Sequence, residues 1–302
     1  MSIRRREISH VPHRAVAVLV CLAWASAAAG QYKGDDYYNQ AAALQKACKQ
    51  REAIPLYTKA IELDNTDSDA FANRGRAWLE TGEYDKAIDD CTEAIRLNPK
   101  DVEAYVTRGR ARTEKGDYDN AIADCNQAAA IQPKDSSAFY FLGLAWDRKG
   151  NYDRAVTDFN EAIRLDPKDA DYFYGRANAW KHRAAYDKAL ADFNQALTLR
   201  PDMSAARNSL AWLQATCPDA RYRNGKKAFQ HASRVYESDG GKNWDYVDTL
   251  AAAYAECGDL KQARQYAAKA VDLATRDEDK QTCRSRLELY QRGKPYRESQ
   301  PR

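Results

Sequence analysis

The sequence repeats itself every 34 residues, and this period constrains the fold more than any single residue does. Residues of one kind recur at that spacing: Gly75, Gly109, Gly143 and Ala177; Tyr84, Tyr118, Tyr152 and Tyr186; Pro99, Pro133, Pro167 and Pro201. A unit of this length cannot bury its own apolar face, so neighbouring units have to stack on one another. The chain is therefore expected to form a solenoid with a long exposed surface that suits binding.

Each unit is predicted to be a hairpin of two helices, as residues 68–101 illustrate. Apolar residues between 70 and 78 are spaced for one face of a helix, and Gly82 ends that helix. A second apolar stripe runs from 87 to 97, and Pro99 ends it.

The two helices of a unit are expected to cross closely, because small residues occupy the crossing. Gly75 lies on the first helix and Ala87 and Ala94 on the second, where larger side chains would overpack the contact. Cys91 and Cys125 face the inside of their own hairpins, so they are interpreted as small core residues.

The pattern of the unit resembles a known family. Numbered from Ser68, it has an aromatic residue at 4 and 11, Gly or Ala at 8, Gly at 15, Tyr at 17, Ala at 20 and 27, and Pro at 32. This resembles the tetratricopeptide repeat. The resemblance implies an all-α fold, a right-handed superhelical solenoid of helix hairpins with a capping helix at its C-terminal end.

Seven repeats and a cap are predicted from this pattern. The repeats are 34–67, 68–101, 102–135, 136–169, 170–203, a degenerate 204–243 and 244–277. The degenerate unit carries extra residues that are expected to lengthen the turn between its helices. A capping helix is predicted over 278–291, followed by a basic tail over 292–302.

Residues 1–29 have the layout of a secretory signal peptide. Four arginines precede an uncharged stretch from Ala15 to Ala29 that ends in Ser-Ala-Ala-Ala. We expect cleavage near Ala29 and export to the periplasm or the cell exterior. A retained membrane anchor stays open as the alternative, although an apolar run of about 15 residues is short for a bilayer span.

Removal of residues 1–29 takes away four arginines and one glutamate and leaves 43 basic and 43 acidic side chains. Nucleic acid is not an expected partner, because its recognition usually needs a basic domain or stripe. The exception is the segment from Arg284 to Arg302, with six basic and two acidic residues. A solvated tail is favoured there; weak contact with an anionic membrane is the alternative.

No catalytic, metal or cofactor motif is present, so the chain is not expected to be an enzyme. After cleavage His182 and His231 remain, and neither has a carboxylate or metal ligand at a suggestive spacing. Cys217 and Cys257 share one position in successive units, and whether they form a disulfide stays open. An enzyme subunit with an unrecognised site is the remote alternative.

Charged residues also follow the period. Position 23 of four units holds Asp90, Asp124, Asp158 and Asp192, and position 7 holds Arg74, Arg108, Leu142 and Arg176. The three arginines are predicted to pair with the aspartates of their own units, because a guanidinium meets a carboxylate in two places while its stem packs. A row of cationic binding points is the alternative.

The resemblance implies that the first helix of each unit lines a concave wall, with positions 2, 5, 9 and 12 facing it and 6 and 13 at its edge. The candidate peptide-binding groove on that wall consists of Asn39, Asn73, Arg76, Arg110, Tyr140, Phe141, Leu144, Tyr174 and Trp212. Packing between repeats is the alternative role for the aromatic residues. Only Asn73 and Arg110 match the residues with which some members of the family grip a peptide carboxylate.

We therefore expect a non-enzymatic scaffold that holds a protein or peptide in this groove without a cofactor. An envelope-targeting or structural element of a larger complex is the alternative. Neither the partner nor the oligomeric state follows from the sequence.

Overall fold

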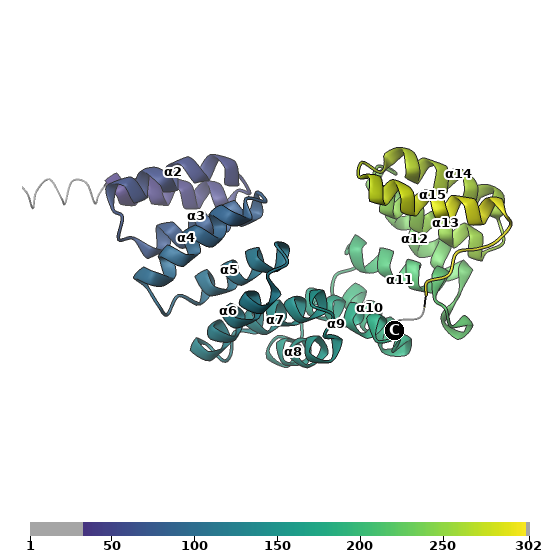
Figure 1. Ribbon diagram of the computed structural model, residues 1–302, viewed down its shortest axis with the longest axis horizontal. Coiled ribbons are helices and arrows are strands. Elements are labelled where there is room, and N and C mark those ends of the chain that lie inside the picture. The colour runs from purple at the N-terminus through teal and green to yellow at the C-terminus, as the bar shows by residue number, and fades with distance from the viewer. Residues whose placement is uncertain (1–32, 300–302) are drawn as a thin grey trace, which may run out of the picture. The chain divides into compact units, whose positions relative to one another are not determined.

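The computed structural model describes residues 33–299, and in that range it consists of helices joined by short connections, without strands (Figure 1). The expected all-α class is confirmed over these residues. The chain forms two compact units, one ending at Pro133 and the other beginning at Lys134. The predicted signal peptide lies outside the described residues.

The first unit contains three helix hairpins. Its helices span 33–46, α2 Gln50–Leu63, α3 Ser68–Glu80, α4 Tyr84–Leu97, α5 Val102–Glu114 and α6 Tyr118–Ile131. Helices α3 and α4 pack on each other, as do α5 and α6, and α4 also packs on α5.

The second unit continues the same pattern from α7 to the cap. Its helices are α7 Ser136–Arg148, α8 Tyr152–Leu165, α9 Ala170–His182, α10 Tyr186–Leu199, α11 Ser204–Thr216, α12 Gly225–Asp239, α13 Trp244–Glu256, α14 Leu260–Leu273 and α15 Asp277–Gln291. A short 3-10 turn, Ala220–Tyr222, occupies the longer connection between α11 and α12. Helix α15 packs on α14 and follows the last hairpin.

Helix starts and stops follow the 34-residue period. The first helices of four repeats are capped by the carboxylates of Asp67, Asp101, Asp135 and Asp169, which accept backbone N–H bonds of 2.8 to 3.0 Å. Gly82 ends the first helix of its repeat with a φ of +84°, in the left-handed region. Cys48 and Ala184 hold the same position in their repeats and share this conformation, with φ of 57°.

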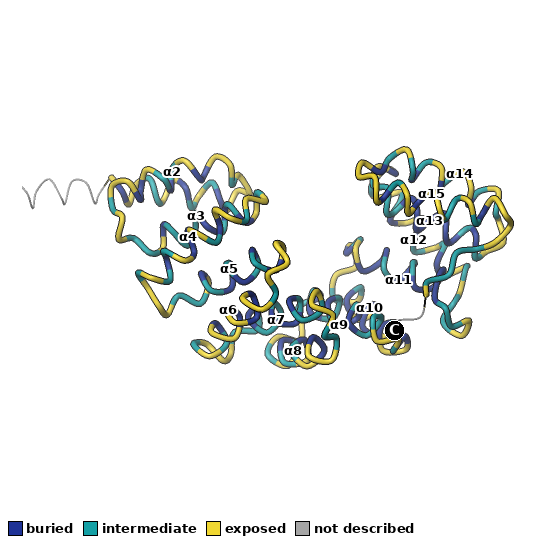
Figure 2. The backbone as a smooth tube through the Cα atoms, viewed as in Figure 1, coloured by how far each residue is buried: buried dark blue, intermediate teal, exposed yellow. Residues whose placement is uncertain are grey.

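The helix crossings are as tight as the small residues predict. A Cβ on Gly75 would lie 2.7 Å from the Sγ of Cys91, and a Cβ on Gly109 would lie 2.7 Å from the Sγ of Cys125. In the second unit the ring of Phe159 fills this space between Gly143 and Gly175. Buried and exposed stretches alternate along each helix, as expected of helices with one packed face (Figure 2).

The cysteines of the described chain are free thiols. Cys217 and Cys257 are both among them, so the disulfide left open by the sequence is not formed. Among the described helices, none combines the length and apolar character that crossing a bilayer requires.

Candidate functional site

The first unit carries a hollow on the first helices of three successive repeats. Its volume is about 590 Å³ and it is lined by Tyr38, Asn39, Ala42, Gln45, Lys46, Cys48, Gln50, Tyr57, Asn73, Arg76, Glu80 and Glu103. Apart from Cys48, Gln50 and Tyr57, these residues occupy the repeat positions that the resemblance assigns to the concave wall. The structure thus brings together Asn39, Asn73 and Arg76 of the predicted groove, whereas Arg110 does not line this hollow.

Hydrogen bonds within α3 and between neighbouring repeats hold the polar side chains of the hollow in place. The amide of Asn73 donates to the hydroxyl of Tyr38 at 2.9 Å, and Arg76 Nη2 donates to Asn73 Oδ1 at 2.8 Å. Arg76 also forms an ion pair with Glu103, while its Nε is buried without a hydrogen-bond partner. The wall is therefore preorganised, and one buried donor on it still lacks an acceptor.

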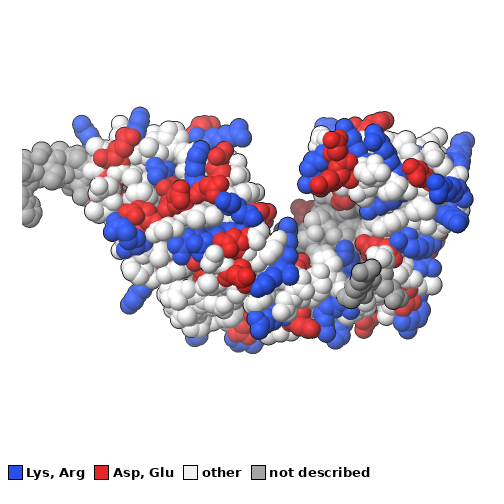
Figure 3. All heavy atoms as spheres, in the orientation of Figure 1, with Lys and Arg blue, Asp and Glu red and all other residues white. Residues whose placement is uncertain are grey.

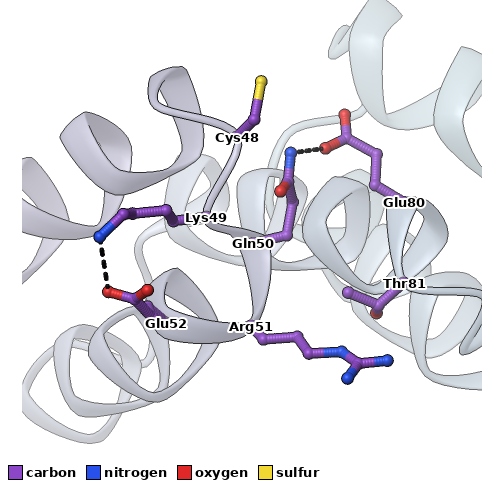
Figure 4. A pocket seen from close by; sticks show the side chains of 7 residues that line it. All are labelled: Cys48, Lys49, Gln50, Arg51, Glu52, Glu80 and Thr81. Carbon is purple, nitrogen blue, oxygen red and sulfur yellow. Dashed lines mark hydrogen bonds and ion pairs between the residues drawn. The ribbon is translucent and has the colours of Figure 1, made fainter.

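A smaller pocket adjoins the hollow at the turn before α2 (Figure 4). It shares Cys48, Gln50 and Glu80 with the hollow, and Gln50 donates to Glu80 at 2.6 Å. Figure 3 shows acidic and basic side chains interspersed over the visible face of both units.

The structure contains the three expected Arg–Asp pairs. Arg74 meets Asp90 through bonds of 2.7 and 2.7 Å, Arg108 meets Asp124 through 3.0 and 2.7 Å, and Arg176 meets Asp192 through 2.7 and 2.7 Å. The remaining Nη1 of each arginine reaches the preceding second helix, at Thr58, Thr92 and Asn160. Each arginine therefore joins the two helices of its own repeat to the repeat before it.

Repeat 136–169 departs from this arrangement, because Leu142 replaces the arginine. Leu142 is buried, and within the described part of the chain the nearby charge of Arg154 alone offsets the burial of Asp158. Burial raises the pKa of Asp158 to about 6. At neutral pH the charged form of this carboxyl is therefore expected to lower the stability of the fold.

The predicted aromatic residues of the second unit are half-buried and packed. Tyr140 lies with its ring centroid 5.1 Å from that of Tyr172 and 5.9 Å from that of Phe159, and Tyr174 lies 6.1 Å from Phe193. Phe141 packs on Tyr140 at 5.0 Å, and Leu144 joins the same cluster. These contacts favour the packing role that the sequence left open for them.

Trp212 is covered by the C-terminal segment of the chain, so the prediction of a solvated tail is wrong for this segment. The Trp212 indole N–H donates to Glu298 Oε1 at 2.7 Å, and its ring lies 5.8 Å from that of Tyr296. In Figure 1 the yellow segment after α15 runs back beside α11. The tail docks because its aromatic ring and charges find complementary groups there, a property that net charge does not reveal.

A buried ion pair lies next to Trp212 and the docked C-terminal segment. Asp248 on α13 is fully buried and pairs with Arg286 on α15, and burial raises the pKa of Asp248 to about 6. Arg286 also lies against two rings, 4.5 Å from the centroid of Trp212 and 4.8 Å from that of Tyr296. This pair could not be predicted from the repeat, because neither residue recurs at the 34-residue spacing.

One further pair was missed. His182 Nδ1 lies 3.1 Å from Asp147 Oδ1, and the imidazole packs on Tyr152 with ring centroids 4.8 Å apart. The two residues are 35 positions apart, one more than the repeat, so they meet on neighbouring first helices. No group of three potential metal ligands occurs among the described residues.

Comparisons with known proteins agree with the hairpin geometry. One tetratricopeptide repeat model matches residues 68–101, and a second matches residues 92–136, 106–170 and 140–206. No curated protein matches this sequence.

Solved structures extend the likeness beyond the matched repeats. A tetratricopeptide repeat protein from Parabacteroides merdae has a TM-score of 0.63 at 16% identity, over 86% of this chain and 99% of that one. The thermophilic tetratricopeptide repeat protein TTC0263 from Thermus thermophilus has 0.52 at 18% identity, over 58% and 95%. MamA from Desulfovibrio magneticus has 0.50 at 20% identity, over 57% and 97%. At these identities the structures show the fold alone, and the matched models, which span residues 68–206, identify this part of the chain as tetratricopeptide repeats.

Proposed function

We propose that the chain is a non-enzymatic scaffold that holds an extended peptide or protein segment on the first helices of its repeats. Tetratricopeptide repeats are protein-interaction modules, and the hollow of the first unit is the observation that carries the finer proposal. It spans three successive first helices and is concave, as a ligand site usually is.

The chemistry of the hollow suits the backbone of an extended segment. Its cations Lys46 and Arg76 are balanced by Glu80 and Glu103, so no single charge dominates. Asn39 and Lys46 are exposed and have no hydrogen-bond or ion-pair partner among the described residues. Peptide carbonyl and amide groups can satisfy such donors and acceptors.

Preorganisation supports the same proposal. Because Tyr38, Asn73 and Arg76 already hold one another, little side-chain freedom is lost when a ligand binds. The proposal also includes export through residues 1–29, which places the scaffold outside the cytoplasm. Envelope attachment through the basic tail is less well supported, because Arg297 of the tail is engaged in an ion pair with Glu256.

The test is a selection of binding peptides from a random displayed library, using the mature chain, followed by calorimetric titration of the selected peptides. We expect Asn73→Ala and Arg76→Ala to weaken binding roughly ten-fold, as loss of a hydrogen bond to a charged or desolvated group does. Arg96→Ala is the matched control, since Arg96 is an exposed arginine paired with Glu93 on a second helix. Equal binding by all three variants would place the ligand surface away from the first helices.

A further inference from the structure

The C-terminal segment of this chain binds the second unit in the manner of a bound peptide. The backbone N–H of Glu298 donates to the carbonyl of Thr216 at 2.9 Å, and Arg297 Nη1 donates to the carbonyl of Ala215 at 3.2 Å. Both carbonyls belong to the last turn of α11. The segment has no regular secondary structure between 294 and 299.

Three consecutive side chains of the segment each meet a complementary group. Tyr296 lies against Trp212 and the guanidinium of Arg286. Arg297 forms an ion pair with Glu256 on α13. Glu298 accepts the indole N–H of Trp212. The recognised pattern is therefore aromatic, basic, acidic at successive positions.

The receiving residues occupy the repeat positions of the concave wall. Trp212, Ala215 and Thr216 stand at positions 9, 12 and 13 of repeat 204–243, and Glu256 stands at position 13 of repeat 244–277. In the second unit the segment thus covers repeat positions 9, 12 and 13, and in the first unit the same positions line the hollow.

The charges that receive the segment are also paired without it. Arg286 is held by the buried Asp248, and Glu256 accepts a bond from Arg223 at 3.2 Å. If the segment leaves, Arg286 and Glu256 each keep an oppositely charged partner. Undocking therefore avoids the free-energy cost of an unpaired buried charge. A segment that completed the core would instead be expected to supply the sole partner of a buried charge.

We propose that residues 295–298 are an internal occupant of a peptide-binding surface formed by α11, α13 and α15. A protein partner reaches this surface by displacing the tail with an extended segment of the same chemistry, an aromatic side chain followed by a basic and an acidic one. This surface belongs to the second unit, so the inference stands or falls separately from binding in the hollow of the first.

The experiment uses a synthetic peptide of residues 292–302 as the probe and the full mature chain as the receptor. Tyr296→Ala combined with Glu298→Ala releases the tail. The released variant is expected to bind the peptide, and the unsubstituted chain at least about ten-fold more weakly, because a tethered competitor acts at an effective concentration on the order of millimolar. Adding Trp212→Ala to the released variant should abolish binding.

Three results would overturn the proposal. The first is a released variant with unchanged helix content that does not bind the peptide. The second is equal binding of a scrambled peptide of the same composition. The third is a concentration-dependent dimer of the unsubstituted chain that Tyr296→Ala removes, which would assign the surface to the tail of a second copy.

A second measurement covers the case in which the released variant does not fold. In the unsubstituted chain, amide hydrogen exchange at Glu298 should be much faster than exchange in the middle of α11, because the tail undocks without unfolding the unit. Equal protection at both places would make the tail an integral part of the fold and contradict the inference.

Discussion

Arg108 and Asp124 are joined by two hydrogen bonds of 3.0 and 2.7 Å across the helices of one hairpin, and Arg112 adds a third at 2.7 Å. Asp124 therefore has two arginine partners, whereas Asp90 has one, Arg74, among residues 33–299. Loss of one arginine should consequently have different effects in the two repeats.

Arg74→Leu is expected to destabilise the fold more than Arg108→Leu. The first change leaves a buried carboxylate unpaired, at a cost of about 1 to 3 kcal/mol, while Arg112 still satisfies Asp124 after the second. Denaturant unfolding of both variants measures the difference. Double-mutant cycles with Asp90→Asn and Asp124→Asn would contradict the pairing if either pair of changes were strictly additive.

Asp158→Asn should stabilise the protein at alkaline pH and have less effect in acid. The folded-state pKa of Asp158, about 6, lies above its ordinary value of 3.8, so the folded protein binds the proton more tightly than the unfolded chain does. The cost of the charge is therefore fully present above about pH 6 and disappears as the pH falls below 4. Melting temperatures at pH 8 and pH 4 test this; an equal gain at both would contradict it. Asp192→Asn, which removes a paired carboxylate, is the control and should lower the melting temperature at pH 8.

Ala184→Gly is expected to stabilise the second unit by about 1 kcal/mol, because Ala184 has a positive φ that glycine adopts without a Cβ clash. The reverse change, Gly150→Ala, tests the same position in the preceding repeat and should cost a similar amount. Calorimetric unfolding of the two variants should show shifts of opposite sign. Shifts of one sign would mean that packing, and not the backbone, dominates at this turn.

Secretion of the full chain by a host with a general export pathway should yield a protein whose N-terminal sequence begins near Gly30 or Gln31. This expectation rests on the basic, apolar and small-residue segments before Gln31, which have the layout of a signal peptide. Recovery of an intact Met1 form in the cytoplasm would refute export and cleavage together.

Contacts that obey the repeat were predictable from the sequence. The arginine and the aspartate of each pair, such as Arg108 and Asp124, are 16 residues apart. Because the repeats share one register, this spacing brings the two side chains together in each of the three repeats. Gly75 and Cys91 were predictable for the same reason, since a close crossing demands a small residue on one side. The resemblance to the tetratricopeptide repeat implied one wall for Asn39, Asn73 and Arg76, and all three line the hollow.

Contacts between residues that the 34-residue spacing does not relate were not predictable from the repeat. Trp212 and Glu298 are 86 residues apart, and Glu298 lies beyond the last repeat, so no period relates them. Composition described the tail as basic, although its docking depends on the order of Tyr296, Arg297 and Glu298. His182 and Asp147 could have been found by searching one residue beyond the period.

We propose that an extended ligand lies on the first helices of the repeats. Amide hydrogen exchange of the mature chain, with and without a library-selected peptide, tests it most directly, because ligand contacts slow exchange where they form. We predict that the peptide protects helix 33–46, α3 and the start of α5, and leaves α4 and α6 unchanged. Protection confined to α4 and α6 would contradict the claim.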